Sequence, residues 1–268
     1  MLRKISLLFA LCLCFQISIL KAEKRDSCIV KTVIVHGLND TKSWALSPLK
    51  WDAKDWLVFS GISAATGSLI AWGDQPIYSN VNKIHSKTLD KVAIGLEPAG
   101  YAYPIAAIAG FMVHGLIAKD NYSVETSLIA SESIFLSTLL VQGVKYTCGR
   151  SRPDKWGTGD SHNWGGPFSG GNSFFSGHTT AAFSVASVIA YRYRDTKWVP
   201  IVSYGLATLG GLERIYDNRH WASDVLMGAT VGTATGILLC KQWEKNTIQF
   251  FPTVTTDGAG FSVVIPIK

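Results

Sequence analysis

The sequence predicts an all-α fold, a bundle of six helices followed by a small C-terminal β-hairpin. Six apolar runs are long enough to form helices, and none has the alternating pattern of a half-buried strand. Charged residues make up 16% of the 268 residues and apolar residues 47%, whereas soluble domains carry roughly 25% charged residues. The chain is therefore membrane-associated or unusually rich in buried helix, and it is long enough for one sizeable core.

The first 22 residues are typical of a secretory signal peptide. Arg3 and Lys4 precede an apolar stretch over residues 5–20, and Ala22 offers a small residue for cleavage. An uncleaved membrane anchor is the alternative. We expect four parts along the chain: the signal peptide at residues 1–22, a polar lead-in at 23–55, the helical bundle at 56–245 and the hairpin at 246–268.

The six expected helices are rich in Ala, Gly, Ser and Thr, which permits close approach of neighbouring helices. They cover residues 56–72, 101–118, 125–144, 177–193, 198–212 and 221–240. A shorter amphipathic helix is expected at residues 89–96, and the glycine-rich residues 154–173 are expected to form a loop. Residues 248–255 and 260–267 flank an Asp-Gly turn signal and are predicted to pair as the hairpin.

The apolar runs and the signal sequence predict an exported protein, periplasmic or membrane-associated, with its site facing the outside. That orientation requires at least one early run not to span the membrane. The run at residues 56–72 is the weakest candidate for a membrane span, because its length of about 17 residues is the shortest that can cross a bilayer. A soluble exported bundle would also place the site outside. The net charge of +6 comes without a basic run interleaved with aromatic residues, so nucleic acid is not an expected partner.

The segment around Ser176, Gly177 and His178 is the first candidate for chemistry. Ser176 is a good N-cap for the apolar run that follows, and the backbone N–H groups of a helix N-terminus bind anions. Gly177 lets the backbone approach such an anion closely, and His178 would stand beside it as a proton donor. An ordinary capped helix with a surface histidine is the alternative.

His220 and Asp224 are four residues apart at the start of a helical run and therefore share one face. A carboxylate there orients the imidazole and makes its other nitrogen a better nucleophile. Arg214 precedes a polar turn that can fold it back toward His220. A surface pair that supports the helix end is the alternative; metal ligation is disfavoured because no further ligands stand at zinc-like spacing.

Lys145 and Arg152 stand at the end of the third run. The planar fork of arginine matches phosphate oxygens, and lysine adds a mobile point charge. Cations at a helix end also complement the helix dipole, which is the alternative explanation.

Taken together, the three clusters resemble the type 2 phosphatidic acid phosphatase and vanadium haloperoxidase superfamily, in its phosphatase branch. Lysine, six residues and Arg-Pro are followed by Ser-Gly-His, and then by arginine, five residues, histidine, three residues and aspartate. The resemblance covers residues 125–240 and implies a helical bundle of the phosphatidic acid phosphatase type. Two positions depart from the family pattern: Phe175 stands where proline is usual, and Glu213 where serine is usual. A carboxylate at Glu213 would pair with Arg214 or repel phosphate.

The resemblance also implies the roles of the residues. His220 would attack phosphorus, Asp224 would orient it, and His178 would protonate the leaving oxygen. The phosphate-binding residues would be Lys145, Arg152, Ser176, Gly177 and Arg214. Because three cations already surround the phosphate, no metal or other cofactor is expected. The attacking and donating histidines would need pKa values that are pushed apart.

These roles predict a metal-independent phosphatase that hydrolyses phosphate monoesters or diphosphates, mainly of lipids, through a phosphohistidine. The alternatives are a vanadate-dependent haloperoxidase, an exported non-specific acid phosphatase that acts on soluble esters, and a non-enzymatic membrane bundle. The export signal, the apolar helices and the short length weigh against the haloperoxidase.

Overall fold

The computed structural model describes residues 39–153, 159–245, 249–255 and 258–264. The expected signal peptide at residues 1–22 lies outside them. Within the described residues the fold is helical up to residue 245, as predicted. The longer helices are α3 (Ala53–Ser68), α4 (Asp74–Val81), α5 (Lys87–Leu96), α6 (Ala102–Ala118), α7 (Asn121–Cys148), α8 (Gly177–Arg192), α9 (Trp198–Tyr216) and α10 (Ala222–Lys245).

Each of the six predicted runs lies mostly or wholly within one of these helices, but the expected count of six leaves out two elements. The first run continues through a π-helical segment, η2 (Leu69–Gly73), into α4. The short amphipathic segment forms α5, and a 3₁₀ turn, η3 (Glu97–Gly100), joins it to α6. A further 3₁₀ turn, η1 (Ser47–Lys50), precedes α3.

Local capping explains where several helices begin and end. Asp52 and Asp55 form a reciprocal capping box at the start of α3, and Asp120 accepts a hydrogen bond from the first turn of α7. Ser176 caps α8, as its sequence predicts. Gly149 ends α7 in the left-handed conformation that glycine adopts without steric cost.

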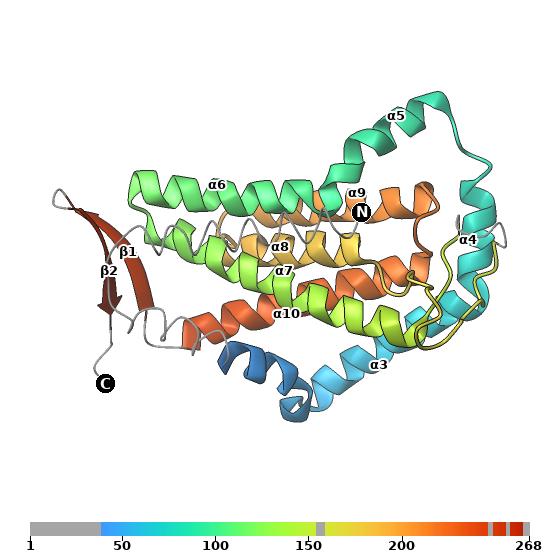
Figure 1. Ribbon diagram of the computed structural model, residues 1–268, viewed down its shortest axis with the longest axis horizontal. Helices are drawn as coiled ribbons and strands as arrows, with labels where there is room; N and C mark the ends of the chain where they lie inside the picture. The colour runs from blue at the N-terminus through green and yellow to red at the C-terminus, as the bar shows by residue number, and fades with distance from the viewer. Residues whose placement is uncertain (1–38, 154–158, 246–248, 256–257, 265–268) are drawn as a thin grey trace.

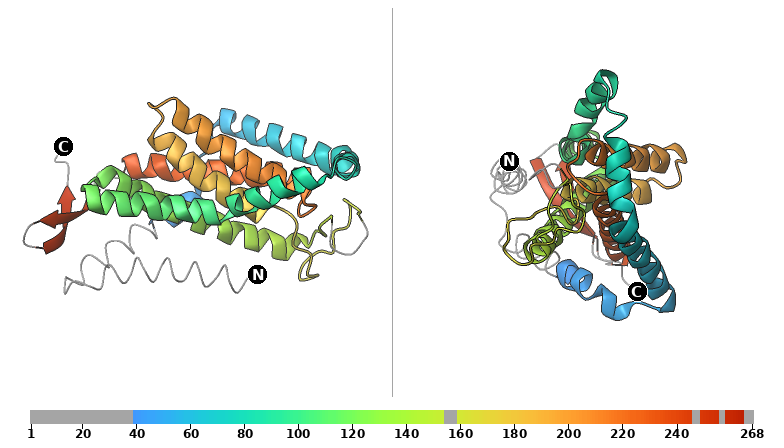
Figure 2. Two further views of the ribbon diagram at one scale, coloured as in Figure 1. Left: turned by 90° about the horizontal axis from the view of Figure 1, so that it is seen from above. Right: turned by 90° about the vertical axis from the view of Figure 1, so that its right-hand side faces the viewer.

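Helix α8 is central, because it packs against α7, α9 and α10. Figure 1 shows α6 to α10 running along the long axis of the molecule, with α3 on the outside. Helix α4 turns to cross one end of the bundle, and α5 projects beyond it; the end-on view in Figure 2 shows α4 lying over that end. The strands β1 (Gln249–Thr255) and β2 (Gly258–Val264) pair antiparallel and lie toward the opposite end.

The contact between α8 and α10 depends on a stripe of glycines on α10, which the small-residue content predicted. Gly228, Gly232 and Gly236 recur every four residues and face α8. A Cβ added to Gly232 would overlap the carbonyl oxygen of Thr180, and one at Gly228 would lie 2.7 Å from the carbonyl oxygen of Ser176. The close approach therefore fixes the start of α10 against the start of α8.

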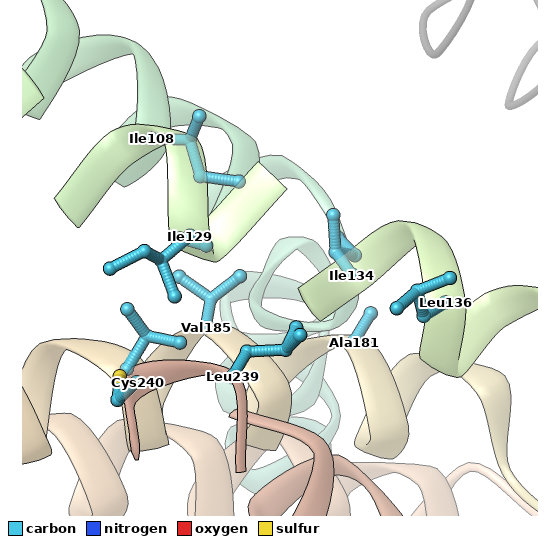
Figure 3. Close-up of a cluster of buried hydrophobic side chains, with 10 residues drawn as sticks. Ile108, Ile129, Ile134, Leu136, Ala181, Val185, Leu239 and Cys240 are labelled. Atoms are coloured by element: carbon cyan, nitrogen blue, oxygen red, sulfur yellow. The ribbon is translucent and has the colours of Figure 1, made fainter. Parts of the chain in front are cut away.

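The buried core lies between α6, α7, α8 and α10 (Figure 3). Its members are apolar side chains that are at most 4% exposed: Ile108, Ile129, Ala130, Ile134, Leu136, Ala181, Val185, Val188, Leu239 and Cys240. Several of these residues come from α7 and α8, so the core fixes the relative position of the two helices whose ends carry Lys145 and His178.

Three helical stretches are long and apolar enough to cross a membrane: Ala53–Val81, Asn121–Cys148 and Ala222–Lys245. The pair Lys87–Gly100 and Ala102–Ala118, bent by 49°, would form a fourth if it counts as one span. The run at residues 56–72 was expected to be the weakest span, but η2 and α4 extend it to 29 residues. Only 6% of its window is buried inside the protein, so this stretch turns most of its apolar side chains outward.

Candidate active site

The residues predicted to form the site are gathered at the end of the bundle that α4 crosses. There α7 and α9 end and α8 and α10 begin (Figure 1). The ring of His178 lies within electrostatic range of Arg214, His220, Lys145 and Arg152. The ring of His220 is also within range of Lys145, Arg152 and Asp224. The structure therefore brings together side chains that are up to 79 residues apart, the separation of Lys145 from Asp224.

The first turn of α8 is held against the start of α10. The Ser176 hydroxyl accepts hydrogen bonds from the backbone N–H and the hydroxyl of Thr179, and the backbone N–H of Ser176 donates to the carbonyl oxygen of Asp224 at 3.0 Å. A Cβ on Gly177 would lie 3.9 Å from Nζ of Lys145. The lysine ammonium therefore lies beside the helix N-terminus, where backbone N–H groups without helical partners point outward.

Two residues that the sequence analysis did not single out hold His178 in place. The ring of Tyr101 meets the His178 ring edge to face, with centroids 4.8 Å apart. Gly100 lies so close that a Cβ there would overlap the imidazole. The η3 turn thus forms the wall behind this histidine, and the available sequence signal was only a Gly-Tyr pair at the start of an apolar run.

His220 and Asp224 face each other as their spacing predicts. Nδ1 of His220 lies 3.5 Å from Oδ2 of Asp224, and both side chains are almost fully buried. Oδ2 also accepts hydrogen bonds from the Ser173 hydroxyl at 2.5 Å and from the Trp221 backbone N–H at 3.0 Å. The backbone N–H of His220 donates to the carbonyl oxygen of Arg214 at 3.2 Å, so the turn does fold Arg214 back toward the histidine.

Burial and positive neighbours lower the pKa of both histidines. Burial lowers the pKa of His220 to about 3, and the positive charges of Lys145 and Arg152 act in the same direction. Burial lowers the pKa of His178 to about 2, with further effects of Arg214 and its other cationic neighbours. The expectation of separated pKa values is therefore wrong for the site without phosphate, because the same cations surround both rings. At neutral pH, His220 is in the neutral form that a nucleophile requires.

Glu213, one of the two departures from the family pattern, pairs with Arg214. The two side chains are 4% and 3% exposed. Nη2 of Arg214 donates to Oε1 of Glu213 at 2.5 Å, and Nε donates to the other carboxylate oxygen. Of the two possibilities that the sequence left open, the structure shows the ion pair. One edge of the Arg214 guanidinium is thus occupied by the protein itself.

Phe175, the other departure, is buried under the site. It is 3% exposed and meets Phe174 edge to face, with centroids 5.8 Å apart, and the peptide bond between them is cis. Phe174 in turn packs against Trp164 of the preceding loop. The aromatic side chain packs the loop at residues 159–173 down against the start of α8.

The structure also places two charged residues at the site that the sequence analysis missed. Arg150, two positions before Arg152, forms an ion pair with Asp224 at 2.7 Å. Its guanidinium also contacts Asp74 of α4 at 2.7 Å. The available signal for Asp74 was a carboxylate directly after an apolar run, at the start of a polar segment. A small pocket beside His220 is lined by Tyr78 of α4 and Ile215 at the end of α9.

Among the described residues, no group of three or more His, Cys, Asp or Glu side chains could hold a metal ion. The positive charges near the two histidines come from lysine and arginine, and the Asp224 carboxylate lies beside His220. Cations and N–H donors that converge on one point are complementary to an anion with several oxygens, such as a phosphoryl group.

The fold and site together define a helical bundle with a cationic, histidine-containing site at one end. Residues 126–248 match the family model of the PAP2 superfamily.

Individual relatives match different shares of the chain. A lipid A 1-phosphatase of Porphyromonas gingivalis is 37% identical over 152 residues, which are 56% of this chain and 31% of the relative. A lipid A 1-phosphatase of Rhizobium johnstonii is 26% identical over 212 residues, with 72% of this chain and 81% of the relative covered. The crystal structure of Aquifex aeolicus LpxE matches with a TM-score of 0.50 at 24% identity, over 63% of this chain and 94% of that one.

The chain spans 31% of the length of the first of these relatives. The structural match is evidence for the fold: the all-helical PAP2 arrangement that the resemblance implied is confirmed. Together with the apolar helices described above, the matches indicate a membrane-associated protein.

Proposed function

We propose that this protein is a metal-independent lipid phosphatase that hydrolyses phosphate monoesters or diphosphates through a phosphohistidine. The observation that carries the proposal is the convergence of Lys145, Arg152 and Arg214 on the pair of histidines, one of which lies 3.5 Å from a buried carboxylate. Phosphoryl transfer needs fixed positive charge around three equatorial oxygens more than it needs covalent chemistry from the protein.

In the first step His220 attacks phosphorus. Its Nδ1 faces Asp224, so Nε2 is the nitrogen that forms the bond to phosphorus while the bond from phosphorus to the leaving oxygen breaks. Asp224 stabilises the positive charge that develops on the imidazole. The backbone of Ser176 and Gly177, together with the three cations, binds the phosphoryl oxygens. Water then hydrolyses the phosphohistidine and releases phosphate.

His178 protonates the leaving oxygen. Without phosphate its pKa is about 2, because burial and the cations disfavour the imidazolium. A phosphate dianion among the same cations offsets their charge and raises the pKa of His178, so substrate binding itself supplies the proton donor. In the second step the neutral imidazole accepts a proton from the attacking water.

The substrate class is proposed from the surroundings of the site. Exposed apolar side chains cover the outer faces of the bundle, such as Leu57 of α3, Ile117 of α6 and Ile201 of α9, each more than 70% exposed. A membrane-embedded bundle with its site at one end fits a phosphate on a lipid. Because two relatives are named lipid A 1-phosphatases, a lipid A 1-phosphate is the first substrate to test.

We place the site end on the periplasmic or outer side of the membrane, after export directed by residues 1–22. Phe168 at that end is 88% exposed, and Lys119 lies at the opposite end of α6. In intact cells a membrane-impermeant maleimide should label Phe168→Cys and leave Lys119→Cys unlabelled. The reverse pattern would place the site inside.

The function is tested with detergent-purified protein and a panel of lipid A, phosphatidate, phosphatidylglycerol phosphate and polyprenyl diphosphate. We expect phosphate release in the presence of a metal chelator, inhibition by vanadate, and loss of activity in His220→Ala. A matched control is His162→Ala, because that imidazole is exposed on the loop and its loss should leave the rate unchanged. Wild-type activity in His220→Ala would overturn the proposal.

A soluble ester such as p-nitrophenyl phosphate separates the lipid phosphatase from a non-specific acid phosphatase. A lipid enzyme should show a kcat/KM at least tenfold higher for its lipid than for the soluble ester. Equal values would favour the acid phosphatase.

A further inference from the structure

Arg150 is a buried cation that lies between two buried carboxylates. It is 1% exposed, and its Nη1 and Nη2 atoms lie 2.7 Å from Oδ1 of Asp224 and from Oδ2 of Asp74, respectively. The side chains of all three residues have no exposed surface. Burying charges is costly unless geometry and hydrogen bonding are both good, so these contacts must be well satisfied to persist.

All five N–H donors of the Arg150 guanidinium have protein acceptors. Nε and Nη2 both donate to the carbonyl oxygen of Ser161, at 3.2 and 2.8 Å, and Nη1 also donates to the Ser223 hydroxyl at 2.7 Å. The two carboxylates accept the remaining two hydrogen bonds. The rings of Trp164 and Trp221 lie 4.8 and 5.4 Å from the guanidinium carbon. Because an arginine has five such donors, none is left for a phosphate.

Asp74 connects this arginine to the first turn of α10. Its Oδ1 accepts from the backbone N–H of Ser223 at 2.9 Å, and its Oδ2 accepts from the Ser223 hydroxyl at 2.5 Å as well as from Arg150. The neighbouring side chain of Gln75 accepts from the backbone N–H of Ser161 at 3.2 Å. Helix α4 is therefore tied both to the start of α10 and to the loop that follows α7.

The two oxygens of Asp224 have separate partners. Oδ1 is bound by Arg150 at 2.7 Å, while Oδ2 faces Nδ1 of His220 at 3.5 Å and accepts from Ser173 and from the Trp221 backbone. A carboxylate held at both oxygens cannot rotate about its last bond. The hydrogen bond from Arg150 to Oδ1 therefore helps to fix the position of Oδ2 next to the imidazole.

We infer that Asp74 and Arg150 are positioning residues for the reaction, and that α4 supports the nucleophile His220 through the chain Asp74–Arg150–Asp224. This inference rests on the proposed function. It assigns α4 a role in turnover, although α4 lies outside the segment that matches the superfamily. Neither residue binds phosphate, so their loss should slow the chemical step and leave substrate binding almost unchanged.

A second buried ion pair in the same bundle provides a matched control. Arg192 of α8 and Glu125 of α7 are 8% and 5% exposed and lie 2.7 Å apart. The Arg192 guanidinium also lies 3.7 Å from the ring centroid of Tyr122. This pair resembles the Asp74–Arg150 pair in burial and geometry but sits at the far end of α8. Breaking it should cost stability and have no direct effect on His220.

The experiment compares Asp74→Asn and Arg150→Lys with Glu125→Gln and Arg192→Lys, as full-length proteins in detergent. For the first two variants we expect kcat to fall about 10- to 100-fold with KM within twofold of wild type, because small displacements of reacting groups cost up to about a hundredfold. The two control variants should keep kcat within about twofold of wild type, even where their thermal midpoints fall as much as those of Asp74→Asn and Arg150→Lys.

Two outcomes would overturn the inference. In the first, Asp74→Asn is as active as Glu125→Gln when equal amounts of folded protein are compared. In the second, Asp74→Asn and Arg150→Lys lose activity only through a higher KM. A further check adds Asp74→Asn to the Asp224→Asn variant. If Asp74 acts through the Asp224 carboxylate, the second substitution should not lower kcat again. An additive loss would contradict the proposed connection from Asp74 through Arg150 to Asp224. A failure of the proposed function can be distinguished from a failure of this inference, because His220→Ala would then keep the wild-type rate.

Discussion

Glu213 is the residue whose replacement tests most directly how the site binds phosphate. Its carboxylate occupies one edge of the Arg214 guanidinium, with both side chains at most 4% exposed. A phosphoryl group must share this arginine with Glu213 or displace it. Glu213→Gln keeps the shape and one acceptor oxygen but removes the competing charge, so phosphate should bind more tightly in the variant.

The size of the effect follows from the kind of bond that is lost. Hydrogen bonds to charged groups contribute about 1.5–3 kcal/mol each, and burial leaves this pair little screened by water. Replacing one such bond by a neutral one worth about 0.5–1.5 kcal/mol relieves about 1–1.5 kcal/mol of competition, which corresponds to phosphate binding that is about 5- to 10-fold tighter. The assay is the inhibition constant of inorganic phosphate during ester hydrolysis, compared between wild type and Glu213→Gln.

The same variant should be less stable without ligand, because breaking a buried pair leaves Arg214 without its counter-charge, at a cost of about 3–5 kcal/mol. Added phosphate should restore most of the lost thermal midpoint. Glu125→Gln, at the far end, should lose stability that phosphate does not restore. An inhibition constant that is unchanged or higher in Glu213→Gln would refute the competition and make Glu213 an orienting partner of Arg214.

Three other predictions concern the acid, the nucleophile and the helix packing. His178→Ala should lower kcat about 10²- to 10⁴-fold for an alkyl phosphate and far less for p-nitrophenyl phosphate, whose leaving group needs no proton; equal losses would argue against the acid role. The folded-state pKa of His220 is about 3 against an ordinary value of 6.5, so the unfolded chain binds the extra proton and stability falls as the pH drops from 6.5 toward 3. His220→Gln should remove about 3 kcal/mol of this loss at pH 4, measured as the change in thermal midpoint between pH 7 and pH 4; an unchanged acid sensitivity would mean that His220 is not buried in its neutral form. Gly232→Ala should lower the midpoint by forcing α10 away from α8, whereas Gly205→Ala, where a Cβ meets nothing within 4 Å, should be neutral or slightly stabilising.

Much of the helical framework could be predicted from local sequence. The apolar runs mark the long helices, and the Ser176 N-cap marks where α8 begins, because caps and periodicity depend on residues close together in the chain. The proximity of His220 and Asp224 was also predictable from their spacing of four residues, although His220 lies in the bend just before α10 and only Asp224 stands in its first turn. Helix α4 was not predicted, since Asp74–Val81 is mostly polar and contains a proline, and it joins the preceding apolar run only through a π-helical segment.

The order and spacing of two histidines, a carboxylate and three cations at the ends of apolar helices were enough to predict which residues carry the chemistry. What surrounds these residues depends on the packing of the helices. Asp74 and Arg150 are 76 residues apart in the chain and meet at 2.7 Å, and the low pKa values of both histidines arise from burial and from cations on other elements. Burial and long-range contacts depend on how helices pack, and no local pattern along the chain specifies that packing.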